Sequence, residues 1–381
     1  MTDTLITHVE PPGVFIEEEL EARGWSKSDL AYALRMSPAQ LSPILNGKLG
    51  ISPAMARALG DVFDVSPEFF ANLNSMYQLS KTPVADPGVQ KRARWLNAFP
   101  VREMIQRGWI EDGDPNLIDP QMLRFFEKDR VEDIPFVGNG EVFAYAARKQ
   151  DYAESITSVQ YAWLQRVRLV AQTINAPEYD EETLRNSLPE IRSHMQSKDD
   201  LQDIPEILRR CGVRLVFVEA LPRGKIDGVC AWLGDQPVIG LTLARDRLDN
   251  FCFVLRHEIE HVLRGDGKDA SFMPPDEVTT EFLRGEGIPE EERFANAAAA
   301  DFLVPQQQLE SFMARKGQFI SEKDVLAFAA RLKINPSVVI GQIQYRRNRY
   351  DWLRKYQKGM RDHVTGWTFT DGWKRPFPIA L

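Results

Sequence analysis

Two histidines near the centre of the chain have the spacing of a metal-binding pair. Residues 256–262 read RHEIEHV, so His257 and His261 lie four positions apart and would share one face of a helix. Two imidazoles in this arrangement can hold one Zn²⁺, and Glu258 beside them can accept a proton from a water molecule at the metal. The chain has only five histidines among 381 residues, so a chance match is uncommon. The motif predicts a metal-dependent hydrolase site with Glu258 as its catalytic residue.

The residues around this motif predict the elements that position it. Apolar residues recur with a helical period at Phe251, Val254, Leu255, Ile259, Val262 and Leu263. Gly265 is typical of a helix end. Upstream the period changes to two, and we expect three short strands at 213–220, 226–234 and 237–244. The backbone of the strand at 226–232 could hold a peptide substrate as an added strand.

A catalytic zinc site needs a third protein ligand. Three consecutive acids, Glu290, Glu291 and Glu292, begin an alanine-rich helix, and spacing does not choose among them because all three also suit the helix dipole. The competing interpretation is a structural zinc site, or one that no longer binds metal. A structural site usually has four protein ligands, often including Cys, and Cys252 lies about 140° from His257 around the helix. Cys252 is therefore a poor fourth ligand.

Composition limits the class of protein. The fractions of hydrophobic (43%) and charged (27%) residues are typical of a globular protein, and 381 residues suggest two or three domains. The net charge of −8 provides no overall basic field for nucleic acid. Three scattered cysteines, the lack of a long apolar run and an N-terminus unlike a signal peptide lead us to expect a cytoplasmic protein without a membrane span.

The first 80 residues predict five short helices, because capping residues and prolines recur where helices would begin. We expect these helices at 14–23, from 26 onward, at 38–46, at 53–63 and at 67–79. Two short helices joined by a tight turn form a helix-turn-helix arrangement. Residues 1–80 hold ten acidic and five basic side chains, so few charges are available to neutralise DNA phosphates. Contact with a protein partner is the alternative use of this bundle.

Residues 13–79 resemble an XRE-type domain, in particular its HigA antitoxin branch. The resemblance rests on Leu30-Ala31, on LNGK at 45–48 and on SPEFFANL at 66–73. It implies a recognition helix at 38–46 that contacts operator DNA. The residues implied to face the groove are Ser37, Gln40, Ser42 and Asn46, and Lys48 is implied to contact a phosphate.

Residues 205–350 are similar to the ImmA/IrrE-type metallopeptidase family, in which strands lead into the His-Glu-x-x-His helix. A later family motif matches ERFANAAAADFLVP at 292–305. The resemblance implies Glu292 as the third ligand of Zn²⁺ or another divalent metal. It also implies that Asn296, one turn further, hydrogen-bonds a ligating histidine.

Two positions depart from the family pattern. Glu260 stands where the family usually has Gly, and Asn296 stands where an acid is common. We expect Glu260 to point to the opposite helix face, without effect on metal binding. The residue that would stabilise the oxyanion stays open among Tyr345, Arg346 and His363.

We therefore expect an α+β, mostly helical protein. Its parts are an XRE/HigA-like five-helix bundle at 1–80, a helical linking region at 81–205, a zincin-like domain with a three-stranded sheet at 206–350 and a tail at 351–381. The expected function is a DNA-binding transcriptional regulator whose zinc peptidase cleaves a repressor or regulatory partner. The alternative is a HigA-like antitoxin that binds a toxin and operator DNA, with the metallo-domain as sensor or scaffold. A homodimer is a further expectation.

Overall fold

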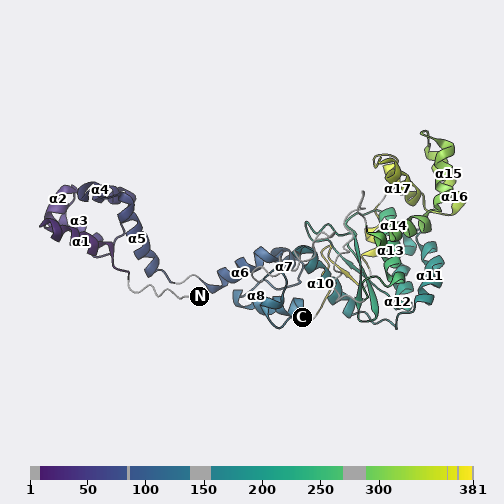
Figure 1. Ribbon diagram of the computed structural model, residues 1–381, viewed down its shortest axis with the longest axis horizontal. Coiled ribbons are helices and arrows are strands. Elements are labelled where there is room, and N and C mark those ends of the chain that lie inside the picture. The colour runs from purple at the N-terminus through teal and green to yellow at the C-terminus, as the bar shows by residue number, and fades with distance from the viewer. Residues whose placement is uncertain are drawn as a thin grey trace. The chain divides into compact units, whose positions relative to one another are not determined.

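The computed structural model describes residues 9–83, 86–137, 156–268, 289–357, 359–366 and 369–379. It divides the chain into two compact units, Met1–Pro87 and Gly88–Leu381 (Figure 1). No helix in the described ranges is both long enough and apolar enough to cross a membrane.

The described part of the first unit is a bundle of helices around one apolar core (Figure 1). Its helices are α1 (Pro12–Arg23), α2 (Lys27–Ala33), α3 (Pro38–Leu45), α4 (Pro53–Phe63) and α5 (Pro67–Lys81), which lie where the sequence predicts them. Serine caps explain these starts, since the side chains of Ser26, Ser37, Ser52 and Ser66 each accept a backbone N–H of the first turn. The fully buried side chains are Ile16, Leu30, Leu41, Leu59 and Phe70.

The second unit begins with helices that precede the sheet in sequence. These are α6 (Pro87–Ala98), α7 (Val101–Gln106), α8 (Ile118–Phe126), α10 (Ser158–Gln172), α11 (Glu181–His194) and α12 (Ile204–Arg210). The strands are β1 (Arg214–Val218), β2 (Gly228–Leu233), β3 (Gln236–Leu241) and β4 (Thr370–Asp371). Between β3 and β4 lie α13 (Leu248–Arg264), α14 (Glu290–Leu303), α15 (Gln306–Lys316), α16 (Glu322–Leu332), α17 (Pro336–Arg347) and α18 (Arg361–Val364).

The strands form one mixed sheet in the order β2-β3-β1-β4. β2 and β3 are an antiparallel hairpin, in which Gly234 takes a left-handed conformation (φ 61°) that suits the tight turn. β1 runs parallel to both β3 and β4. In the described residues β2 therefore pairs on one side only and is an edge strand.

The fourth strand corrects our expectation of three strands and an irregular tail. β4 has only two residues, so it carries no periodic signal. A buried ion pair holds it in place: Arg166 on α10 donates to Asp371 over 2.8 Å, and both side chains are 1% exposed. Trp109 Nε1 donates to the same carboxylate over 2.7 Å. The tail thus joins the sheet through a contact that links positions 205 residues apart.

Helices cover both faces of the sheet. On one face Val216, Val218 and Val238 share a core with side chains of α10, and on the other Leu215 and Phe217 share a core with α13. Figure 1 shows the strands between α10 and α13. Alternate strand residues therefore enter two different cores, as expected for a sheet buried on both sides. Of the region 81–205 that we expected to link two domains, the part from Gly88 onward belongs to the second unit and supplies α10.

Candidate metal centre

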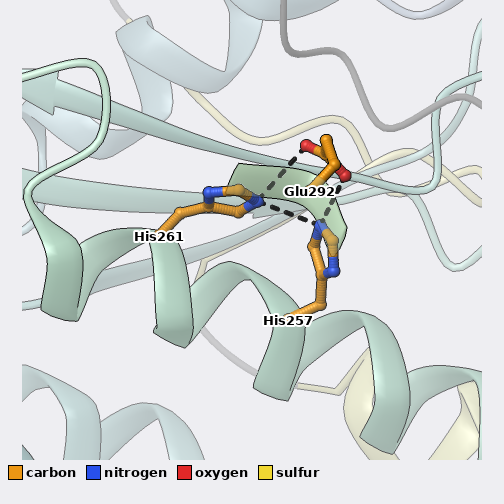
Figure 2. A group of neighbouring side chains, drawn as sticks. All are labelled: His257, His261 and Glu292. Atoms are coloured by element: carbon orange, nitrogen blue, oxygen red, sulfur yellow. Dashed lines mark hydrogen bonds and ion pairs between the residues drawn. The ribbon is translucent and has the colours of Figure 1, made fainter. Parts of the chain in front are cut away.

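Helix α13 brings the two histidines of the sequence motif together (Figure 2). The helix ends at Gly265, whose left-handed conformation (φ 72°) closes the last turn. His257 and His261 are 1% and 2% exposed, and their Nε2 atoms lie 3.0 Å apart. Each imidazole therefore directs its Nε2 atom toward the same buried point.

Glu292 on α14 completes this group, as Figure 2 shows. Its two oxygens divide between the histidines: Oε2 lies 3.2 Å from Nε2 of His257, and Oε1 lies 3.3 Å from Nε2 of His261. Among the three consecutive acids only Glu292 is buried, while Glu290 is exposed and Glu291 half-buried. The packing of α14 against α13 thus brings Glu292, and not Glu290 or Glu291, into the buried group with the two histidines.

The geometry of these three side chains fits a tetrahedral metal site. Metal–ligand bonds of about 2.0–2.1 Å place tetrahedral ligand atoms about 3.3 Å apart. The two Nε2 atoms lie 3.0 Å apart, and each lies 3.2 or 3.3 Å from a different oxygen of the Glu292 carboxylate, distances close to that value. Two imidazole nitrogens and one carboxylate oxygen are also the donor set of a catalytic zinc site with a fourth position left for water or substrate.

The electrostatics of the group couple the histidines to the carboxylate. Burial lowers the pKa of His261, but Glu292, Glu258 and Asp266 together raise it to about 10. Burial raises the pKa of Glu292, but hydrogen bonds from His257 and His261 lower it to about 2. The neighbouring charges therefore favour a protonated imidazole beside an ionised carboxylate, and a metal ion would compete with that proton.

Asp266 holds the second nitrogen of His261, a contact that the sequence did not suggest. Its Oδ2 lies 2.9 Å from Nδ1 of His261 and 3.2 Å from Nε of Arg264. The helix-ending turn makes this possible, because the N–H of Asp266 bonds back to the carbonyl of His261. The one sequence feature that could have predicted this contact is an acid directly after the Gly that ends the helix. A carboxylate in this place fixes the tautomer and orientation of a ligating imidazole.

Asn296, proposed for such a role from the family resemblance, is half-buried on α14. In the described part of the chain it makes no hydrogen bond to either histidine, and Nδ1 of His257 has no partner there. Asn296 instead lines a neighbouring cavity.

Glu258 is buried on α13 beside the edge strand β2. A Cβ atom added to Gly228 of β2 would lie 2.6 Å from Oε1 of Glu258 and 2.7 Å from Cγ1 of Val254. The lack of a side chain at Gly228 therefore lets the strand backbone approach the carboxylate closely. The Glu258 carboxylate thus lies where α13 faces β2.

Glu260 lies apart from the metal ligands. It forms a largely buried ion pair with Arg256 over 2.6 Å, and the Arg256 guanidinium lies 5.0 Å from the centre of the Phe302 ring. Glu260 thus has a buried partner one turn away on its own helix.

The three candidates for stabilising an oxyanion separate in space. Tyr345 and Arg346 line a cavity of about 340 Å³ between α13, α14 and α17. His363 on α18 contacts Asp199 over 3.2 Å and does not line this cavity.

The residues predicted to contact DNA surround the start and end of α3. The side chains of Ser37 and Gln40 form a capping box, and Asn46 donates to Ser42 over 3.2 Å. These four residues and Lys48 are all exposed. They are accessible to a ligand, although the first two are also engaged in capping the helix.

Comparison with known proteins finds one family match in each unit. Residues 16–70 match the family described as helix-turn-helix, and residues 209–341 match the IrrE N-terminal-like domain. Virulence-associated protein A' of Dichelobacter nodosus is 42% identical over 71 residues, which are 18% of this chain and 62% of that protein. The uncharacterized HTH-type transcriptional regulator YddM of Escherichia coli K12 is 33% identical over 70 residues, which are 18% of this chain and 74% of that protein. The chain thus spans less than two thirds of the first relative's length.

Proposed function

Because the chain belongs to the helix-turn-helix family and carries an IrrE N-terminal-like domain, we propose that it is a DNA-binding regulator whose second unit hydrolyses peptide bonds. The proposed substrate is a repressor or another regulatory protein, and the proposed metal is zinc. The observation that carries this proposal is the convergence of His257, His261 and Glu292 beside a buried Glu258 and an edge strand.

In this proposal each residue has one task. When bound, zinc supplies Lewis acidity that polarises a carbonyl group and lowers the pKa of water. His257, His261 and Glu292 hold the ion, and Asp266 keeps the His261 ring in its ligating orientation. Glu258 accepts a proton from the attacking water and delivers it to the leaving amine.

Substrate would be held by the edge of β2 that has no strand partner among the described residues. An extended peptide can add to this edge through main-chain hydrogen bonds, which give affinity without side-chain selectivity. Gly228 would bring such a peptide near Glu258, because its Cα approaches that carboxylate without an intervening side chain.

The test of catalysis is the Glu258→Gln variant, assayed for zinc content and for cleavage of candidate partner proteins. We expect zinc to remain bound and cleavage to fall at least about 100-fold, the usual contribution of a general base. Glu292→Gln should lose the metal, whereas Glu290→Gln, an exposed change on the same helix turn, should keep both metal and activity. Retained cleavage in Glu258→Gln would reject the proposed mechanism.

DNA binding by the first unit needs its own test, because acids outnumber basic side chains there. We propose that it binds operator DNA as a dimer, with α3 in the groove and Lys48 at a phosphate. Lys48→Ala should lower the salt slope of binding to the upstream DNA of its own gene by about one, and Arg57→Ala on α4 is the matched control. No binding at low salt would contradict this proposal.

The acidic charge of the first unit favours a second candidate function. In it the protein is a HigA-like antitoxin that binds a toxin and operator DNA, and the metal unit acts as sensor or scaffold. The Glu258→Gln variant separates the two, since an antitoxin retains its biological effect when zinc stays and catalysis is lost. Both functions imply a cytoplasmic protein.

A further inference from the structure

The cavity beside the metal ligands has a strongly cationic lining. Among the residues that line it are four arginines, Arg245, Arg247, Arg293 and Arg346, against one carboxylate, Asp249. These residues come from the start of α13 and the segment before it, and from α14 and α17. A cavity of about 340 Å³ lies at the small end of the range for ligand pockets, roughly 300–1,000 Å³.

Part of this positive charge is not neutralised by the described residues that line the cavity. Arg247 engages Asp249 through two hydrogen bonds of 3.0 and 2.7 Å, which accounts for the one lining carboxylate. Arg346 contacts Glu310 over 3.3 Å, but that glutamate is 64% exposed and lies outside the lining. Arg293 is exposed, and its side chain has no hydrogen bond or ion pair with any described residue. The cavity therefore favours an anionic ligand.

Part of the cavity lining is apolar. Leu303 and Val338 are 4% and 2% exposed, and Ala300 and Phe253 lie beside them in the lining. Two tyrosines, Tyr345 and Tyr350, are 40% and 46% exposed. The combination suits a ligand with an apolar body and an acidic group at one end.

The cavity also adjoins the metal centre. The Phe253 ring stacks on the His257 imidazole, with ring centres 6.2 Å apart and planes 26° apart. Asn296 in the lining is one turn beyond the ligand Glu292 on α14. A group in this cavity would therefore lie next to a peptide bond at the metal.

We propose that this cavity binds an apolar group that bears a carboxylate. Its source is either a residue of the peptide substrate next to the scissile bond or a free small carboxylic acid. The assignment as a substrate subsite rests on the peptidase function proposed above, whereas carboxylate binding does not.

The test is calorimetric titration of the full-length Glu258→Gln protein with N-acetyl-L-phenylalanine and with its amide, which has the same body but no carboxylate. We expect the acid to bind at least about tenfold more tightly than the amide, the usual effect of one charge-assisted hydrogen bond. Arg293→Gln should remove about tenfold of the acid's affinity and leave the amide unchanged. Arg315→Gln, an exposed change on α15 outside the cavity, is the control.

The Arg293→Gln variant distinguishes binding in the cavity from binding at the metal. An acid bound directly to zinc would not depend on Arg293, so an unchanged affinity in Arg293→Gln overturns the proposal. Equal binding of acid and amide, or no binding of the acid, overturns it as well. The titration measures binding in a variant that is expected not to hydrolyse peptides. The carboxylate proposal can therefore succeed or fail whether or not the peptidase proposal holds.

A second measurement identifies the source of the carboxylate. Competitive inhibition of peptide cleavage by N-acetyl-L-phenylalanine in the wild-type protein, lost in Arg293→Gln, supports a substrate subsite. Arg293-dependent binding without competition supports a free carboxylic acid as the ligand.

Discussion

Gly228→Ala is the sharpest perturbation of the proposed general base that leaves every metal ligand in place. The added methyl group would point from β2 toward α13, where Oε1 of Glu258 lies 2.6 Å away and Cγ1 of Val254 lies 2.7 Å away. Ordinary contacts begin at 3.4 Å, so the carboxylate must retreat by the difference between 2.6 and 3.4 Å, about 0.8 Å. A misplacement of about 1 Å in a catalytic group costs about 100-fold in rate.

Gly240→Ala is the matched control, because it overpacks the same sheet on the opposite face. Its added methyl group would meet the two Cγ atoms of Val167 on α10 at 2.8 and 3.0 Å, and Glu258 is not among its neighbours. Overpacking costs about 1–3 kcal/mol, so we expect both variants to lose similar free energy of unfolding. Only Gly228→Ala should lose about 100-fold in kcat.

The assay needs three readouts on both variants. Zinc per chain should stay equal to wild type, urea unfolding should give similar losses, and cleavage of a peptide that the wild-type protein hydrolyses should separate the two. Equal loss of kcat in both variants would refute the reasoning, because the effect would then be general destabilisation. Unchanged kcat in Gly228→Ala would show that Glu258 does not need its present position.

Three further predictions concern single carboxylates. Asp371→Ala leaves Arg166 buried without its partner, so we expect a loss of about 3–5 kcal/mol in urea unfolding. Burial raises the pKa of Asp119, but hydrogen bonds and charges from α6 outweigh burial and hold it below 3.8. A depressed pKa contributes stability that is present above pH 3.8 and is lost as pH falls through the folded pKa, so Asp119→Asn should make unfolding less steeply pH-dependent below about pH 4. Asp266→Ala removes the partner of Nδ1 of His261 and should weaken zinc binding about 10–100-fold in competition with a chelator.

Exposed acids provide the controls for these changes. Asp351 pairs with Arg349 while 74% exposed, and Asp235 pairs with Lys268 while 90% exposed. Water and salt screen surface pairs of this kind, so Asp351→Ala should barely change unfolding and Asp235→Ala should not change zinc affinity. Effects as large as those of Asp371→Ala or Asp266→Ala would contradict the roles assigned to burial and ligand support.

Local patterns predicted most of the secondary structure. The five helices of the first unit followed from serine caps and prolines, which act within one turn of the backbone. Strands β1, β2 and β3 followed from alternation over five or six residues. β4 did not, because two residues carry no period and its place depends on the Arg166–Asp371 pair.

The sequence by itself determined that His257 and His261 share a helix face, because four-residue spacing is a property of the helix alone. The sequence also indicated Glu292 as the third metal ligand, but through the family resemblance and not through residue spacing. Only the tertiary structure decided that Glu292 is the buried one of the three consecutive acids. It alone also decided that Asp266 contacts Nδ1 of His261 and that Gly228 lets β2 lie close to the Glu258 carboxylate. It alone also gathered arginines from three parts of the chain around one cavity. These contacts join elements that are distant in sequence. They depend on packing and therefore produce no periodic pattern of residues along the chain.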